Sequence, residues 1–461
     1  MKNAPSRTFV LVGLVVAILL FMHFIPQIKI CGVNLRHVDI LCDVVPELDG
    51  GDTHNVISKP LVPDPKSVAH KGSFREVFPS GIECFKDYSE EKSGGMILFY
   101  TALCNIKKLD RPVRIAYFGD SFIEGDIVTA DLREMLQNKY GGCGVGWIDC
   151  ASKTAGFRKS VAQTSDGFIS HSVIDHQIDH KSLGINQRYF IPLESAYTQL
   201  TCTKYKQHSL SCNISQLYYK CFSPICITAT INKNIKHVFN VASSNGKIAA
   251  VKVDGNIHKV KWQISNVRAR TYIYGCTMDC DKGVVVDNYS MRGASGLALM
   301  SVPIATMSSF ASLRPYDLII IHYGLNVANG FDKEAYYMRY QLKMEKVVKY
   351  FKSIYPYSSI VVVSVSDTDE RINGTFDTAK GIETLSAYQQ LVASNTHVVY
   401  FNLFNAMGGR GSMKRMVDKK QANYDYTHIN FRGGHVIAKY FFDAIEAGKS
   451  NYERRKIYEK Q

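Results

Sequence analysis

Short apolar runs of β-strand length alternate with longer amphipathic stretches in much of this chain. The runs lie at residues 115–118, 318–322, 360–365 and 397–403, and apolar residues recur at helical spacing over 127–136, 334–354 and 435–446. Uninterrupted apolar runs are typical of parallel strands that are buried on both faces. Strands that alternate with helices therefore predict an α/β fold built on a parallel sheet. Asp126 is expected to cap the first of these helices.

The segment 153–280 has a different pattern. Its apolar runs are short and rich in Thr, Tyr, Val and Ile, as at 217–219, 227–231 and 251–253, and turn-forming residues such as Asn245-Gly246 separate them. This pattern predicts a β-rich insertion, with carbohydrate binding as one role for it. The insertion divides the α/β domain into 111–152 and 281–448, and a charged, solvated tail at 449–461 follows.

An almost uninterrupted apolar run at residues 9–25 follows Lys2 and Arg7. The run is about long enough to span a bilayer, and the residues after it are bulky, which argues against a cleaved signal peptide. Positive charge on the short N-terminal side predicts that residues 1–8 are cytoplasmic. We therefore expect a single-pass signal anchor, with a stem at 26–110 and the remaining chain outside the cytoplasm. A buried core helix is the alternative for 9–25.

The formal net charge of +14 suits an acidic polymer or an anionic membrane surface. Nucleic acid would also fit this charge, but the sequence has no zinc-finger spacing, aromatic RNA-binding signature or dense basic helix. We therefore expect no nucleic-acid partner.

The 12 cysteines tend to occur in near neighbours. The neighbouring pairs are Cys143 with Cys150, Cys202 with Cys212, Cys221 with Cys226, and Cys276 with Cys280. Short-loop disulfides would fit an exported protein, although the spacing does not assign the pairing and buried thiols are the alternative.

Gly119-Asp120-Ser121 follows the 115–118 run, at a predicted junction between strand and helix. Ligands of α/β sheets bind at the carboxyl ends of strands, where a serine hydroxyl is exposed and its backbone N–H can face an oxyanion. Such a tripeptide is also common as a plain helix cap. Ser121 is therefore a candidate nucleophile that needs partners.

A candidate base for that nucleophile occurs late in the chain. Asp425 precedes His428 by three residues, a separation that lets the carboxylate bond the imidazole and hold the tautomer required of a general base. The apolar stripe of the 435–446 helix follows directly. An isolated Asp-x-x-His is common, so the pair acquires meaning only together with the other segments.

Two further segments supply candidate oxyanion donors. Asn326 follows the 318–322 run in a Gly-x-Asn sequence, and Gly293 and Gly296 lie in the loop Arg292-Gly293-Ala294-Ser295-Gly296. An amide side chain and a glycine backbone N–H can both stabilise a developing oxyanion. Taken alone, an asparagine that stabilises a turn and a flexible loop explain these segments equally well.

In this order, the segments 119–121, 293–296, 324–326 and 425–428 resemble the four sequence blocks of SGNH (GDSL-like) hydrolases. The resemblance covers roughly residues 112–150 and 281–447. It implies a three-layer α/β/α, flavodoxin-like parallel sheet, split here by the β-rich insertion. The anchor, the glycine-rich stretch 140–147 and the insertion are similar to bacterial cell-envelope O-acetylesterases of peptidoglycan. That similarity implies an inner (cytoplasmic) membrane protein with a periplasmic catalytic domain.

The resemblance also implies a role for each block. It assigns Ser121 as nucleophile, His428 as base, Asp425 as its orienting carboxylate, and the oxyanion hole to Ser121, Gly296 and Asn326, with Gly293 as the alternative glycine. The implied enzyme is a carboxylic ester hydrolase that removes O-acetyl groups from an extracytoplasmic polysaccharide through an acyl-enzyme on Ser121, without a cofactor. An O-acyltransferase with the same triad and a noncatalytic glycan-binding protein are the alternatives.

A second cluster of polar side chains lies inside the insertion. His171, Asp175, His176, Asp179 and His180 are all residue types that bind transition metals. The segment lacks the apolar stripe of a packed helix, so we interpret it as a solvated loop and expect no metal site.

Overall fold

The computed structural model describes residues 29–30, 33–34, 74–89, 94–328, 333–372 and 374–460. The chain divides into two units, Met1–Leu61 and Val62–Gln461. In the first unit, β1 (Lys29–Ile30) pairs with β2 (Val33–Asn34) in antiparallel fashion. The expected cytoplasmic segment 1–8 and anchor 9–25 lie outside the described residues. Among the helices that the structure describes, none has the length and apolar character needed to cross a membrane.

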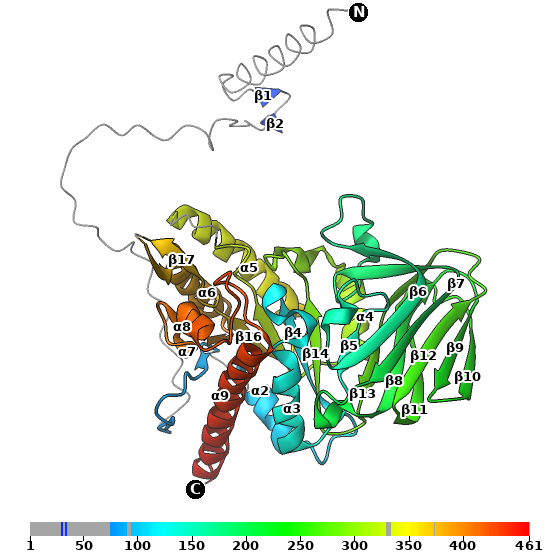
Figure 1. Ribbon diagram of the computed structural model, residues 1–461, viewed down its shortest axis with the longest axis horizontal. Coiled ribbons are helices and arrows are strands. Elements are labelled where there is room, and N and C mark those ends of the chain that lie inside the picture. Colours follow the sequence, from blue (N-terminus) through cyan, green and yellow to red (C-terminus); the bar gives the residue numbers. More distant parts are fainter. Residues whose placement is uncertain are drawn as a thin grey trace, which may run out of the picture. The chain divides into compact units, whose positions relative to one another are not determined.

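A six-stranded sheet organises the second unit (Figure 1). Its strands, in spatial order, are β14 (Val284–Ser290), β4 (Val113–Gly119), β15 (Leu318–His322), β16 (Ser359–Val363), β19 (Val399–Phe401) and β3 (Lys86–Asp87). The first five are parallel, and β3 pairs antiparallel with β19 at the edge. Numbered along the chain, the five parallel strands have the order 2-1-3-4-5, as in flavodoxin-like sheets. The predicted α/β fold with a parallel sheet is confirmed.

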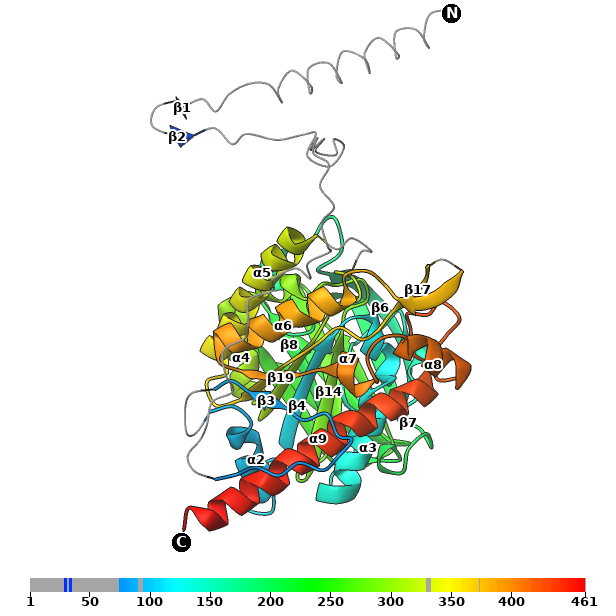
Figure 2. The same ribbon diagram turned by 90° about the vertical axis from the view of Figure 1, so that its left-hand side faces the viewer.

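Helices pack on both faces of this sheet (Figure 2). Successive strand residues point to opposite faces, so Ile115 and Tyr117 join one apolar core while Ala116 and Phe118 join another. The first core includes residues of α2 (Ile97–Cys104), α3 (Thr129–Tyr140) and α9 (Phe431–Tyr458). The second includes residues of α4 (Ile304–Leu313), α5 (Glu334–Ile354) and α6 (Ile382–Thr396).

Shorter elements connect these layers. They are the 3₁₀ turns η1 (Ser121–Asp126), η2 (Ala155–Phe157), η3 (His180–Ser182), η4 (Gln207–Ser209) and η5 (Leu297–Ser301), the hairpin strands β17 (Asp369–Ile372) and β18 (Thr375–Thr378), and the helices α7 (Leu403–Ala406) and α8 (Ser412–Asp418). Of these, η1 begins at Ser121, and η5 begins directly after Gly296.

A separate antiparallel sheet lies between β4 and β14 in the sequence. Its strands are β5 (Gly146–Ile148), β6 (Val161–Ser172), β7 (Arg188–Cys202), β8 (Cys212–Cys221), β9 (Ile225–Ile231), β10 (Ile235–Val241), β11 (Ala249–Ile257), β12 (Lys259–Ser265) and β13 (Thr271–Asp279). The long strand β7 pairs with β6 along most of its length, with β12 at residues 195–201 and with β13 at Phe190. The sheet encloses its own apolar core around Trp262. The strands predicted at 217–219, 227–231 and 251–253 lie within β8, β9 and β11.

Three local predictions need correction. The segment 26–110 is not a stem in its described C-terminal part, because β3 pairs with β19 and the fully buried Phe99 of α2 donates its N–H to Ser359 Oγ at 3.1 Å. The residues from 449 onward are not a solvated tail, because α9 continues to Tyr458 and Tyr452 is buried. Asp126 is not the helix cap.

Asp126 instead organises an ion-pair cluster between η1 and the antiparallel sheet. Its buried carboxylate lies 3.2 Å from Arg133 and 2.9 Å from Arg158, while α3 begins three residues later at Thr129. Burial alone would raise the pKa of Asp126, but the two guanidinium groups lower it below its usual range. The second arginine lies far along the chain, so local sequence favoured a cap.

The cysteines of the described residues are free thiols, so the short-loop disulfides considered from the sequence are not present among them. The thiols that hydrogen-bond one another are Cys143 with Cys280, Cys150 with Cys276, and Cys202 with Cys212. Residues 276 and 280 lie along the extended strand β13 and its end, where four residues span roughly 13 Å. Sequence neighbours in a strand are therefore too far apart for contact.

Candidate active site

The register of the parallel sheet brings three of the four blocks together. Gly119 at the end of β4 is paired with Ser290 of β14 on one side and with His322 of β15 on the other. The segments that follow these strands therefore leave the sheet at the same edge. They carry Ser121, the glycine loop and Asn326 respectively.

Ser121 begins η1, directly after β4. Gly119 allows a tight exit from the strand, because a Cβ there would lie 2.9 Å from the Ile123 side chain and 3.0 Å from the His322 carbonyl oxygen. Ser121 is 9% exposed, so its hydroxyl lies at the floor of the site. Its Oγ lies 3.0 Å from His428 Nε2.

Asp425 and His428 lie in the turn before α9. His428 Nδ1 is 2.9 Å from Asp425 Oδ2, and Asp425 Oδ1 accepts the backbone N–H groups of His428 at 2.9 Å and Thr427 at 3.0 Å. Partial burial raises the pKa of Asp425, but these hydrogen bonds and the imidazole outweigh it, so the pKa lies below its usual value. An ionised Asp425 orients Nδ1–H toward itself and leaves Nε2 as the acceptor for the Ser121 proton.

The close approach of α9 to η1 sets the distance between base and nucleophile. Gly434, in the first turn of α9, packs against the backbone at Ile127, where an added Cβ would lie 1.9 Å from the carbonyl oxygen. Asn430 caps this helix by accepting the N–H groups of Arg432 and Gly433. The turn that holds His428 is thus fixed at the start of a packed helix.

The candidate oxyanion donors surround the same edge. Asn326 is exposed, and its Nδ2 donates to the Ala294 carbonyl oxygen at 3.0 Å, which links the block of β15 to the glycine loop. Gly296 is buried with φ +86°, and a Cβ there would lie 2.7 Å from the Tyr323 ring. Gly293 has φ +76° and open space around it. Gly296 is therefore the glycine that packing requires, while Gly293 is the more exposed.

Asp120 connects the blocks and has a role that the sequence did not reveal. Its carboxylate is 1% exposed and accepts the N–H of Phe122 at 3.0 Å and the backbone N–H groups of Gly324 and Leu325. Burial raises the pKa of Asp120 to about 6 against these lowering hydrogen bonds. This residue ties the turn that carries the nucleophile to the loop of the candidate oxyanion donor.

A second feature missed from sequence supports the turn of the base. The Asp369 backbone N–H donates to the Tyr426 carbonyl oxygen at 3.0 Å, and Phe376 stacks on the Tyr426 ring at 3.8 Å between centroids. Asp367, which follows β16, accepts the N–H of Met413 in α8 at 3.0 Å. In the sequence, this role of Asp367 was indicated by its position just beyond the carboxyl end of a predicted strand.

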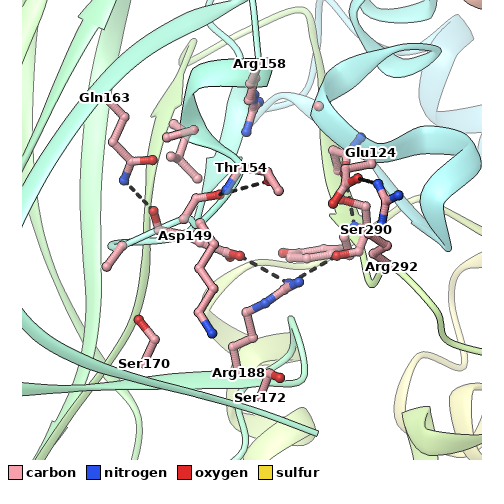
Figure 3. A pocket seen from close by; sticks show the side chains of 18 of the residues that line it. Glu124, Asp149, Thr154, Arg158, Gln163, Ser170, Ser172, Arg188, Ser290 and Arg292 are labelled. Carbon is pink, nitrogen blue, oxygen red and sulfur yellow. Dashed lines mark hydrogen bonds and ion pairs between the residues drawn. The ribbon is translucent and has the colours of Figure 1, made fainter. Parts of the chain in front are cut away.

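A cavity of about 230 Å³ lies next to η1, between the two sheets (Figure 3). On one wall Arg292 pairs with Glu124 at 2.8 Å, and on the other Arg188 pairs with Asp149 at 3.2 Å. Arg188 also donates to the Ser290 carbonyl oxygen at 3.1 Å, which joins the antiparallel sheet to the end of β14. Each wall thus carries one ion pair, and the lining residue Glu124 lies three residues after the candidate nucleophile.

A histidine and two aspartates of the segment 171–180 contact neighbouring residues of the insertion. His171 stacks on Tyr189 with ring centroids 4.8 Å apart, Asp175 accepts the Ser172 N–H, and Asp179 accepts the Lys181 N–H at the start of η3. Within the described ranges, no group of three or more His, Cys, Asp or Glu side chains is placed to hold a metal ion.

Comparison with solved structures identifies the fold. A peptidoglycan O-acetylesterase aligns with 79% of this chain and 99% of its own, with a TM-score of 0.66 and 19% sequence identity. The chain shares the fold of that enzyme. Together with the four blocks, this makes it resemble the SGNH hydrolases, and peptidoglycan O-acetylesterases among them.

Other comparisons are weaker. A family two carbohydrate esterase from Cellvibrio japonicus matches over 64% of this chain and 99% of its own, with 9% identity and a TM-score of 0.25. A GDSL-like lipase from Parabacteroides merdae matches over 36% of this chain and 74% of its own, with 13% identity and a TM-score of 0.28. TM-scores this low support no structural argument. No family model and no curated protein matches the chain.

Proposed function

We propose that this protein is a carboxylic ester hydrolase that removes O-acetyl groups from a polysaccharide. One observation carries the proposal, namely the continuous contact from Ser121 Oγ to His428 Nε2 at 3.0 Å and from His428 Nδ1 to Asp425 at 2.9 Å. These are hydrogen-bonding distances for a nucleophile, a base and an orienting carboxylate. Ser121 and His428 lie 307 positions apart in the chain, so local structure does not explain their contact.

The reaction follows from this geometry. His428 accepts the Ser121 proton while Ser121 attacks the acetyl carbonyl, and the alcohol of the sugar leaves with a proton from His428. Water, deprotonated by His428, then attacks the acyl-enzyme, and His428 returns the proton to Ser121 Oγ as acetate leaves. The Ser121 N–H, the Asn326 amide and the Gly296 or Gly293 N–H hold the oxyanion in both steps. No cofactor is required.

The substrate proposed is an acetylated glycan, with peptidoglycan the leading candidate. The cavity lined by both sheets runs beside the nucleophile's turn, and its paired arginines and carboxylates offer hydrogen bonds to sugar hydroxyls. The protein that shares this fold over 79% of the chain is itself a peptidoglycan O-acetylesterase. We further propose that residues 9–25 anchor the protein in the cytoplasmic membrane with the catalytic domain in the periplasm.

The test is release of acetate by the full chain from a small chromogenic acetate ester and from O-acetylated peptidoglycan, with Ser121→Ala in parallel. Activity that disappears in Ser121→Ala supports the proposal. The matched control is Ser353→Ala, because Ser353 is exposed on α5 and its hydroxyl donates to the Tyr350 carbonyl oxygen of the same helix. Equal activity of Ser121→Ala and wild type would refute it. Release of the chromogenic alcohol that requires an added acceptor glycan, with the acetyl group recovered on that glycan and not as acetate, would instead identify a transferase.

A further inference from the structure

Two pairs of thiols lie at the ends of strands of the antiparallel sheet. One pair lies where the chain enters and leaves this sheet, and the other lies at a connection between two of its strands. Cys143 precedes β5, and Cys280 follows β13, so the two residues bracket the whole β-rich region. Their thiols hydrogen-bond each other. Both also line one open cavity of about 460 Å³, together with Asn213, whose Oδ1 is contacted by Cys143 Sγ at 3.8 Å and by the Asp281 N–H at 3.0 Å.

The second pair closes the connection between β7 and β8. Cys202 ends β7 and Cys212 begins β8. Cys212 is paired in register with Ile257, and the Cys202 Sγ lies 3.7 Å from the carbonyl oxygen of the same Ile257. Their thiols hydrogen-bond each other as well.

A third pair differs in its access to solvent. Cys276 is paired in register with Ile148, two residues before Cys150, and both cysteines are 0% exposed within the core. In the first two pairs, by contrast, one partner is half-buried, namely Cys143 and Cys202. A dissolved oxidant can therefore reach the first two pairs and not the third.

We propose that the folded protein forms two disulfides, Cys143–Cys280 and Cys202–Cys212, when it meets a disulfide oxidant such as oxidised glutathione, while Cys150 and Cys276 remain thiols. The proposal does not depend on the esterase function. The first bridge joins the entry and exit of the β-rich region, and the second closes the β7–β8 connection.

The chemistry assigns a different role to each partner. A hydrogen bond from Cys280 lowers the pKa of Cys143, and one from Cys212 lowers the pKa of Cys202, so these half-buried sulfurs are the better thiolates. The Cys143 thiolate attacks one sulfur of the oxidant, forms a mixed disulfide and releases one small thiol. Cys280 then loses its proton and attacks Cys143 Sγ, which releases the second thiol. Two protein thiols are oxidised and one disulfide is reduced to two thiols. Cys202 and Cys212 react in the same way.

The experiment maps the cysteines of the full chain. Reduced, folded protein is incubated with oxidised glutathione, denatured with N-ethylmaleimide present, and digested without reduction for mass spectrometry. We expect peptides linked through Cys143–Cys280 and Cys202–Cys212, and maleimide on both Cys150 and Cys276. Oxidation should also raise Tm, on the order of 5–10 °C, because one long loop and one short loop of the unfolded chain are closed.

Variants separate the bridges. Cys143→Ser should abolish the link to Cys280 and part of the rise in Tm, but leave the Cys202–Cys212 link. The matched control is Cys221→Ser, because the Cys221 thiol donates to the Ala242 carbonyl oxygen, and both links should remain. Maleimide on all four cysteines of the two pairs, or a Cys143–Cys150 link, in the oxidised wild type would overturn the proposal whatever the variants do.

Discussion

Asp425→Asn tests whether the carboxylate sets the protonation of the base. In the structure Asp425 Oδ1 accepts two backbone N–H groups and Oδ2 faces His428 Nδ1. Asparagine can keep its oxygen on the backbone groups, so its NH₂ must then face Nδ1. Nδ1 becomes an acceptor, and the imidazole proton moves to Nε2, where it points at Ser121 and blocks proton transfer.

The size of the effect follows from the contacts. The corresponding change in a serine protease triad lowers kcat by about 10⁴-fold, chiefly through the wrong tautomer. Here the Asp425 side chain is 48% exposed, and water can partly replace it at Nδ1. We therefore expect a loss of about 10³- to 10⁴-fold in kcat, which is about 4–5.5 kcal/mol of transition-state stabilisation, with little change in KM.

The assay is steady-state hydrolysis of a chromogenic acetate ester at saturating substrate, with Tm measured in parallel. Asp418→Asn is the matched control, since Asp418 is 57% exposed and pairs with Lys414 on α8, away from His428 in sequence. That variant should retain wild-type kcat. An Asp425→Asn enzyme with more than a tenth of wild-type kcat and an unchanged Tm would refute the assignment of Asp425 as the orienting residue.

Three further outcomes are expected. Asn326→Ala should lower kcat by about 10²- to 10³-fold with a small change in KM, as for loss of one oxyanion donor; an unchanged kcat would remove Asn326 from the hole. Gly434→Ala should lower the free energy of unfolding by about 1–3 kcal/mol, because its Cβ would meet the Ile127 carbonyl oxygen, whereas Gly156→Ala, with open space around it, should be nearly neutral in the same denaturant titration. Burial, with a neighbouring carboxylate, raises the pKa of Asp369 to about 7, well above its unfolded value of about 3.9. The native state therefore binds an extra proton between about pH 4 and pH 7, so stability should fall as pH rises through this window. Asp369→Asn should flatten this fall in unfolding titrations, and an identical slope would contradict the reasoning.

Local pattern was sufficient for the elements with strong periodicity. The predicted helix 334–354 and strand 318–322 coincide with α5 and β15. The helix has apolar residues at helical spacing over 21 residues, and the strand is a short, isoleucine-rich run whose length suits a buried strand. The sequence did not predict β3, because this strand has two residues and no clear apolar pattern. It pairs with a strand more than 300 positions later. Such a strand exists only because β19 offers an unpaired edge.

The same division applies to the site. The Asp425 and His428 contact was predictable, since three residues of chain separate them and a turn can close that distance. The contact of His428 with Ser121, in contrast, depends on two features of the tertiary packing that the sequence does not show. They are the exit of three segments from one edge of the parallel sheet and the docking of α9 at Gly434.

The sequence by itself determined the α/β class, the order of the four blocks and the residue types available for chemistry, because these depend on short-range periodicity and spacing. The tertiary structure alone decided which distant side chains meet. It paired Cys143 with Cys280 rather than with Cys150, and Asp126 with Arg158 rather than with a helix end. The reason is physical. Strands extend about 3.3 Å per residue and carry sequence neighbours apart, while sheet register and core packing bring remote residues together.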